Sequence, residues 1–203
     1  MEKELTETVQ RAWCTEACAI DEIASYMDYE ALEQAVLLVA EAERIAASGC
    51  GHTGIACRHL THLLCCADRP AHFISPSEGC HGGLGFLQEG DVLFLASRGG
   101  GTQELLPMLQ AALKKKVHVI AVTENLESEL ARGAQVVLPM RVGRETDRYN
   151  SQGTTSFVVM CAIFDALQAA VIEKTGYTEA QFALNHPGGA VGERLNRENG
   201  KQS

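Results

Sequence analysis

The chain has 203 residues, of which 46% are hydrophobic and 21% charged, and its formal net charge is −9 at pH 7. This is the size and balance of one globular domain, so a chain disordered throughout or built of two full domains is excluded. The excess of acidic side chains argues against a nucleic-acid partner, because a phosphate backbone would meet net repulsion. The eight cysteines lie in apolar segments, as reduced thiols of a cytoplasmic protein do.

The sequence carries no signal for export or for a membrane. Its acidic N-terminal segment lacks a basic start followed by an apolar core, and no apolar run approaches the roughly 20 residues of a membrane span. We therefore expect a soluble, cytoplasmic protein with no membrane partner.

Two helices are predicted at the N-terminus, over 3–27 and 29–43, because apolar side chains recur there at steps of three and four residues. After them, apolar runs of strand length alternate with helix-length patterns. The predicted strands are 45–48, 71–75, 91–97, 117–122 and 135–140. Strands that alternate with helices predict a parallel sheet covered on both faces.

The later helices have boundary signals of their own. The segment 102–115 is acidic near its start and basic at its end, in agreement with the helix dipole. A long helix is predicted over 154–174, and a short helix followed by a Pro-Gly-Gly turn over 179–195. The candidate N-cap residues of the long helix are Thr154, Thr155 and Ser156.

We expect one α/β domain in three αβα layers, with a five-stranded parallel sheet in the flavodoxin-like order 2-1-3-4-5. Its expected parts are extra N-terminal helices over 1–43, the core over 44–195 and a tail over 196–203.

Two glycine-rich turns, 49–54 and 97–102, each follow a predicted strand and open a helix. In this strand order, turns after the first and third strands flank one crevice at the carboxyl edge of the sheet. Backbone N–H groups at helix starts, together with hydroxyl and guanidinium groups, bind phosphate. The expected phosphate ligands are Gly51, Thr53, Ser97, Arg98, Gly99, Gly100 and Thr102.

Two other interpretations of these glycines stay open. The first turn has the form GxGxxG, and a nicotinamide-dependent oxidoreductase would use it with an acidic residue about 20 positions further on. Glu78 is only a rough candidate for that acid, and His52 is unusual inside a pyrophosphate turn. The glycines would also serve tight strand-to-helix packing with no ligand at all.

Four strings carry a resemblance to a known family: GCGHTG at 49–54, SPSEGCHGGLG at 75–85, SRGGGT at 97–102 and FALNHPGGAVG at 182–192. With them, the stretch from 45 to 195 resembles the sugar isomerase (SIS) domain, most closely its arabinose 5-phosphate isomerase branch. The resemblance implies a five-stranded αβα sandwich. It also implies a phosphorylated sugar as ligand, which some members isomerise and others only bind, and we expect no cofactor.

The resemblance also implies which groups move protons in an aldose–ketose isomerisation. Glu145, nine residues before Thr154, matches the base of the family. His186 matches a histidine implicated in ring opening, which reaches the site from its own chain or from a neighbouring subunit. His81 matches a histidine that orients substrate hydroxyls, and His52 or His81 would polarise the substrate oxygens.

The chain departs from the isomerase branch at three positions. His52, Gly99 and Gly101 stand where that branch has lysine, serine and glutamate. A histidine is shorter than lysine and its charge depends on pH, and Gly101 removes a carboxylate. A non-catalytic sugar-phosphate sensor is therefore the main alternative to an isomerase.

The same resemblance implies self-association, as a homodimer or homotetramer, with the amphipathic N-terminal helix and its Trp13 at the interface. No metal site is expected, because soft ligands occur without a CxxC pair and lie on patterned helices. Those ligands are Cys14, Cys18, His59, His62, Cys65 and Cys66.

Overall fold

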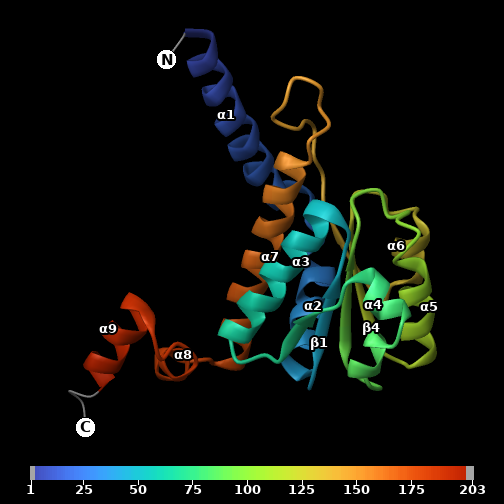
Figure 1. Ribbon diagram of the computed structural model, residues 1–203, viewed down its shortest axis with the longest axis vertical. Helices are drawn as coiled ribbons and strands as arrows, with labels where there is room; N and C mark the ends of the chain where they lie inside the picture. Colours follow the sequence, from blue (N-terminus) through green and yellow to red (C-terminus); the bar gives the residue numbers. More distant parts are fainter. Residues whose placement is uncertain (1–2, 200–203) are drawn as a thin grey trace.

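The computed structural model describes residues 3–199, which form a five-stranded parallel sheet with helices on both faces (Figure 1). The strand order β2-β1-β3-β4-β5 confirms the predicted order and fold class. The strands are β1 (Ile45–Ser48), β2 (Ala71–Phe73), β3 (Val92–Ala96), β4 (His118–Thr123) and β5 (Val136–Pro139). They differ from the predicted ranges only at their ends.

The helices also follow the predicted alternation. They are α1 (Lys3–Tyr26), α2 (Tyr29–Glu41), α3 (Gly51–Cys66), α4 (Pro76–Cys80), α5 (Leu106–Lys114), α6 (Glu129–Gly133), α7 (Thr154–Thr175), α8 (Glu179–Asn185) and α9 (Gly189–Asn199), with a 3-10 turn at Gly83–Phe86. The five-residue helices α4 and α6 were not predicted, because so short a segment shows no period.

One predicted helix start is wrong, and so are the predicted N-cap residues of α7, although α7 begins at Thr154 as predicted. Helix α5 begins at Leu106 and not at 102, because Pro107 is tolerated only in the first turn of a helix. The N-cap of α7 is Gly153, with φ +65° and no capping side chain. Thr154 does not cap the helix, since its hydroxyl accepts a hydrogen bond from the Thr146 backbone N–H at 3.1 Å.

The central strands are buried on both faces. Along β3, Phe94 belongs to the core beneath α2, α3 and α7, whereas Leu93 and Leu95 belong to the core beneath α5 and α6. Phe94 meets Phe164 of α7 edge to face, with ring centroids 6.3 Å apart. The apolar side chains of this strand are therefore buried on both faces of the sheet, as expected of a strand between two helical layers.

Helix α7 is long and apolar enough to cross a membrane, judged by length and composition, contrary to the expectation that no apolar run approaches that length. In this fold it packs against α1, α2 and α3 as well as the sheet. Val159, Ile163, Phe164 and Leu167 are all buried by these contacts. Its composition is thus that of a helix at the centre of a layer.

Candidate functional site

The two glycine-rich turns lie side by side at the carboxyl edge of the sheet, because β1 and β3 are hydrogen-bonded neighbours. A Cβ atom on Gly49 would lie 3.2 Å from the carbonyl oxygen of Ala96, so the backbones approach closely. The turns share one small cavity with the start of α7. It is lined by His52, Thr53, Arg98, Ser156, Phe157 and Met160. The structure therefore brings both predicted turns to one place.

The second turn is held in shape by its own hydroxyls. Ser97 is buried, and its Oγ lies 2.8 Å from Thr102 Oγ1 and accepts a hydrogen bond from the Gly100 N–H at 3.1 Å. Gly99 and Gly101 are exposed beside it. These bonds fix the shape of the turn, and its role in binding phosphate stays a prediction.

Gly100 is the glycine of this turn at which a side chain would cause both strain and a clash. Its φ is +66°, and an added Cβ would lie 2.1 Å from Ser128 Oγ. We expect Gly100→Ala to lower the free energy of unfolding by about 2 kcal/mol or more, through strain and a clash. Gly101→Ala is the matched control, because a Cβ there meets open space. Urea unfolding of both variants tests this, and equal stabilities would contradict it.

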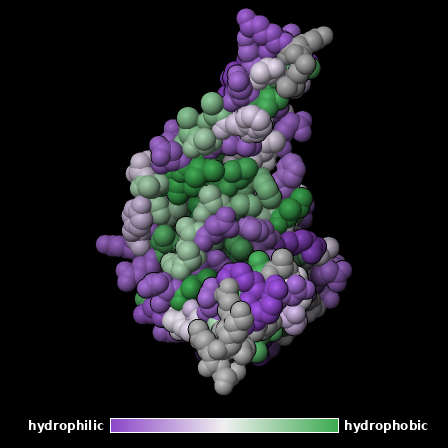
Figure 2. All heavy atoms as spheres, turned by 90° about the vertical axis from the view of Figure 1, so that its left-hand side faces the viewer, coloured by the Kyte–Doolittle hydropathy of each residue, from purple (hydrophilic) through white to green (hydrophobic). Residues whose placement is uncertain are grey.

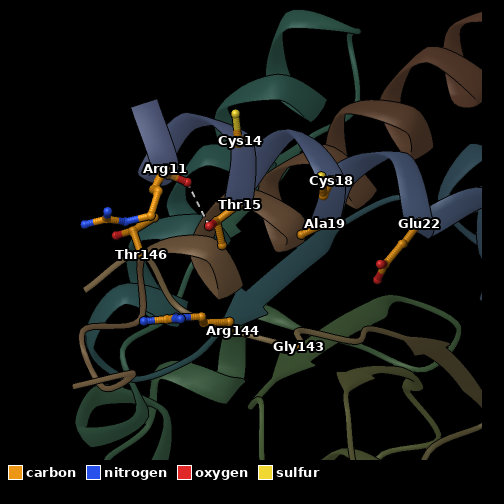
Figure 3. Close-up of a pocket in the computed structure, with 9 residues that line it drawn as sticks. All are labelled: Arg11, Cys14, Thr15, Cys18, Ala19, Glu22, Gly143, Arg144 and Thr146. Atoms are coloured by element: carbon orange, nitrogen blue, oxygen red, sulfur yellow. Dashed lines mark hydrogen bonds between the residues drawn. The ribbon is translucent and has the colours of Figure 1, made fainter. Parts of the chain in front are cut away.

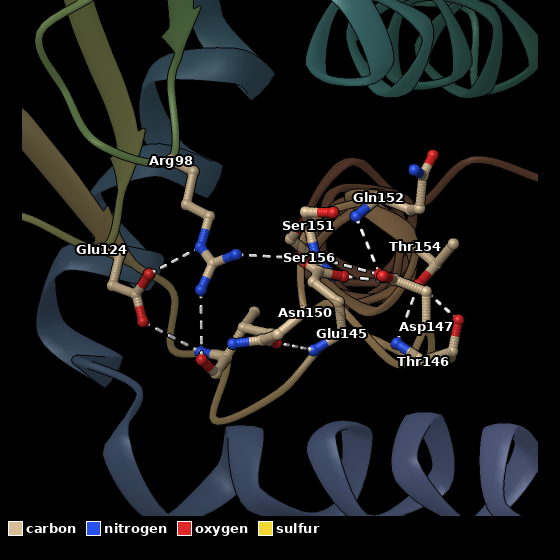
Figure 4. Close-up of polar contacts among 11 residues, drawn as sticks. Arg98, Glu124, Glu145, Thr146, Asp147, Asn150, Ser151, Gln152, Thr154 and Ser156 are labelled. Atoms are coloured by element: carbon tan, nitrogen blue, oxygen red, sulfur yellow. Dashed lines mark hydrogen bonds and ion pairs between the residues drawn. The ribbon is translucent and has the colours of Figure 1, made fainter.

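Glu145, the predicted base, is buried beside this cavity, with 1% of its side chain exposed. Its Oε1 accepts a hydrogen bond from Arg98 Nη1 at 2.7 Å, and its Oε2 accepts one from the Ser156 N–H at 3.2 Å (Figure 4). Ser156 lies in the first turn of α7, where the helix dipole favours a negative charge. A guanidinium and a helix start thus compensate the burial of this carboxylate.

Arg98 was predicted to bind phosphate, but in the structure its guanidinium contacts protein acceptors. Its Nε donates to Glu124 Oε2 at 2.7 Å, and its Nη2 donates to the Val142 carbonyl oxygen at 3.2 Å (Figure 4). Sequence reasoning missed Glu124. The signal was available, because Glu124 directly follows β4 and the carboxyl ends of parallel strands meet at one edge.

The loop between β5 and α7, which carries Glu145, is fixed from within. The Asp147 carboxylate accepts hydrogen bonds from the backbone N–H groups of Gln152 and Ser151, each at 2.9 Å, and these bonds lower the pKa of Asp147. The Glu145 N–H donates to Asn150 Oδ1 at 2.7 Å. The backbone around the predicted base is therefore ordered by its own loop.

Of the predicted catalytic histidines, only His52 lines the cavity. It is exposed in the first turn of α3, with its ring centroid 6.2 Å from that of Phe157. His81 lies at the C-terminal end of α4, where its ring is exposed and does not line the cavity. Its role as a substrate-orienting group stays a prediction.

His186 lies far from Glu145 within one chain. Its Nε2 is 3.3 Å from the Sγ of Cys66, and its ring stacks on Phe182 at 3.8 Å. Cys66 ends α3, whereas Gly51 at the other end belongs to the phosphate turn, and a helix of 16 residues is about 22 Å long. Figure 1 shows α8 and α9 at the end of the molecule opposite the starts of α3 and α7. The expectation that His186 reaches the cavity from its own chain is therefore wrong.

A second, wider cavity lies behind the loop, between α1 and residues 143–146 (Figure 3). Arg144 and Thr146 line it, but Glu145 between them turns to the opposite side. None of the predicted site residues contributes to its walls.

Burial raises the pKa of the Cys50 thiol, which adjoins the cavity, so this group is not a thiolate nucleophile at neutral pH. Among residues 3–199, no three histidine, cysteine or acidic side chains are grouped so that they would hold a metal ion.

The SIS domain family matches this chain over residues 38–170. The chain is 32% identical to the arabinose 5-phosphate isomerase KdsD of Pseudomonas aeruginosa over 93% of its own length and 58% of that protein. It therefore spans from about half to about three fifths of the length of the curated relatives that it matches.

Two solved structures share the fold. A proposed sugar-phosphate isomerase of Listeria monocytogenes superposes with a TM-score of 0.89 at 38% identity, covering 93% of this chain and 100% of that one. A protein of Escherichia coli CFT073 in complex with arabinose 5-phosphate superposes with a TM-score of 0.85 at 26% identity, covering 92% and 100%. Together with the two turns and the carboxylate that meet at one edge of the sheet, these matches show that the chain belongs to the SIS domain family.

Proposed function

We propose that the protein is an aldose–ketose isomerase of sugar phosphates, with arabinose 5-phosphate and its ketose isomer ribulose 5-phosphate as substrates. The observation that carries this proposal is the buried Glu145 carboxylate beside the cavity where the two turns meet. Similarity to an arabinose 5-phosphate isomerase and to a protein solved with arabinose 5-phosphate supports the choice of sugar.

The proposed reaction uses the two turns for binding and Glu145 for proton transfer. The hydroxyls of Ser97 and Thr102, Thr53 and the amides of both turns hold the phosphate. Glu145 removes the proton from carbon 2 of the open aldose, the electron pair forms the carbon 1–carbon 2 double bond, and oxygen 1 takes a proton. Return of a proton to carbon 1, with loss of the proton from oxygen 2, gives the ketose.

In this proposal a second copy of the chain supplies His186, which gives a proton to the ring oxygen as the sugar opens. The distance of His186 from Glu145 within one chain supports this arrangement. So does the apolar area on the face shown in Figure 2. A hollow near the start of α7 is lined by Ile55, Phe157 and Val158, with Glu16 of α1. Trp13, on the same α1 helix, is 66% exposed and is available for burial between copies.

The second candidate is a sensor that binds sugar phosphates without converting them. Two observations favour it: His52 is exposed where the isomerase branch has lysine, and Gly101 has no side chain where that branch has glutamate. A sensor would need the turns but not the carboxylate.

Proton exchange separates the two candidates. We expect the protein in deuterated water to exchange the hydrogen at carbon 2 of arabinose 5-phosphate and at carbon 1 of ribulose 5-phosphate, followed by NMR. A panel of other pentose and hexose phosphates gives the specificity. Saturable binding of a sugar phosphate without exchange across the panel would make the protein a sensor.

We place this activity in the cytoplasm. All eight cysteines are free thiols in the structure, which suits a reducing compartment. The net charge of −9 argues against a nucleic acid as a further partner.

A further inference from the structure

We propose that Arg98 and Glu124 are positioning residues that act through Glu145: the Arg98 guanidinium holds the buried carboxylate of the base, and Glu124 shares that guanidinium with it. This inference rests on the role of Glu145 in the proposed function.

Arg98 contacts the Glu145 carboxylate directly, and Glu124 contacts both Arg98 and the segment before Glu145. Arg98 reaches Glu145 with one edge of its guanidinium and Glu124 with another, both at 2.7 Å. Glu124 uses its second oxygen to accept a hydrogen bond from the Val142 N–H at 3.1 Å, which anchors the segment leading to Glu145 (Figure 4).

The backbone of Arg98 is held equally firmly. Its carbonyl oxygen accepts hydrogen bonds from the Glu124 N–H at 2.9 Å and from Thr123 Oγ1 at 3.0 Å. Arg98 is thus fixed at its backbone by the end of β4 and at its guanidinium by two carboxylates. A planar guanidinium with several donors suits this shared arrangement, and a lysine does not.

One cation therefore serves two carboxylates of very different exposure. Glu145 is 1% exposed, whereas the side chain of Glu124 is 35% exposed. Without the positive charge, burial favours the protonated form of Glu145. Without the negative charge of Glu124, the whole attraction of Arg98 falls on Glu145 and favours its ionised form. Removal of the Arg98 charge and removal of the Glu124 charge therefore have opposite effects on the protonation of Glu145.

The other charged groups near Glu145 stay the same in both variants. His52 stands across the cavity on α3, and Arg144 and Asp147 lie on the same loop as Glu145. The first turn of α7 contributes hydroxyl and amide groups but no titratable side chain. A difference in sign between the variants therefore reports on Arg98 and Glu124 alone.

The test is the pH dependence of kcat/KM for the proposed isomerisation. We expect Arg98→Met to move the acid limb of the profile upward by about one pH unit or more, and Glu124→Gln to move it downward. Arg98→Lys keeps the charge but loses the planar donors, so it should leave the limb near its wild-type position while lowering kcat. Glu127→Gln, which changes an exposed carboxylate on the same connection, should change neither.

A second readout needs no activity. NMR of the protein labelled with 13C at glutamate carboxyls, with the Glu145 signal assigned by its loss in Glu145→Gln, gives the titration midpoint of that carboxyl directly. We expect the midpoint to rise in Arg98→Met and to fall in Glu124→Gln. Folding of each variant is checked in the same spectra.

The outcomes separate this inference from the proposed function. Midpoints that move as expected in a protein without isomerase activity would support the positioning role and contradict the proposed function. An active enzyme whose midpoint and acid limb stay in place in both variants, even with a lower kcat, would show that Arg98 and Glu124 are only structural. If Arg98→Met does not fold, Glu124→Gln decides by itself, because a Glu145 midpoint that fails to fall in that variant would contradict the inference.

Discussion

Glu145→Gln is expected to lower kcat for arabinose 5-phosphate by about 10³-fold, because a positioned general base contributes roughly 10²–10⁴-fold to such a reaction. Glutamine has almost the same volume and keeps an oxygen that accepts from the Ser156 N–H, but it cannot remove a proton. The turns that hold the phosphate stay intact, so KM should change little. NMR of deuterium incorporation at carbon 2 measures the effect.

Glu127→Gln is the matched control, since it makes the same chemical change at an exposed residue. Its kcat should equal that of the wild-type protein. If Glu145→Gln kept a tenth of the wild-type rate or more, the base would have to be another group. His52, which lines the same cavity, would then be the first candidate.

The second large effect is complementation between two inactive variants. His186→Asn alone should lose most ring-opening activity, and Glu145→Gln alone loses proton transfer. If each site combines Glu145 of one copy with His186 of another, unfolding and refolding the two variants together restores intact sites. In randomly mixed dimers about a quarter of the sites carry both native residues, so about a quarter of the wild-type activity should return.

The control for complementation is a pair of variants whose altered residues both belong to the same chain's part of the site. Ser97 and Glu145 lie at the same edge within one chain, because Arg98, the residue after Ser97, contacts Glu145. Mixing Ser97→Ala with Glu145→Gln therefore creates no native site and should restore nothing beyond the activity of Ser97→Ala itself. Absence of recovery with His186→Asn, despite demonstrated mixed dimers, would show that His186 acts elsewhere.

These expectations follow from what lies at each end of the helices α3 and α7, which pack in one layer. Helices α3 and α7 both start at the edge where the turns meet, and their amides and dipoles serve that edge. The other end of α3 holds α8 and His186 through Cys66. Within one chain, the groups proposed to bind the phosphate and the candidate acid His186 therefore lie at opposite ends of α3.

Much of the fold was determined by local sequence features. Apolar runs of strand length marked all five strands, and the two glycine-rich turns marked the two neighbouring strands whose ends meet at one cavity. Such features succeed because burial of an apolar face and the left-handed φ of a residue such as Gly100 are requirements of a few neighbouring residues. The start of α5 was misjudged for a reason equally local, the place of Pro107.

The partners of the charged side chains were decided only by tertiary structure. Arg98 lies 47 residues from Glu145 and 26 from Glu124, and His186 lies 120 residues from Cys66. No periodicity relates such pairs, because their meeting depends on strand order, on where loops cross the sheet edge and on the length of α3. The family resemblance therefore named Glu145 and His186 as a catalytic pair, while packing placed one beside Arg98 and the other at the far end of the same chain.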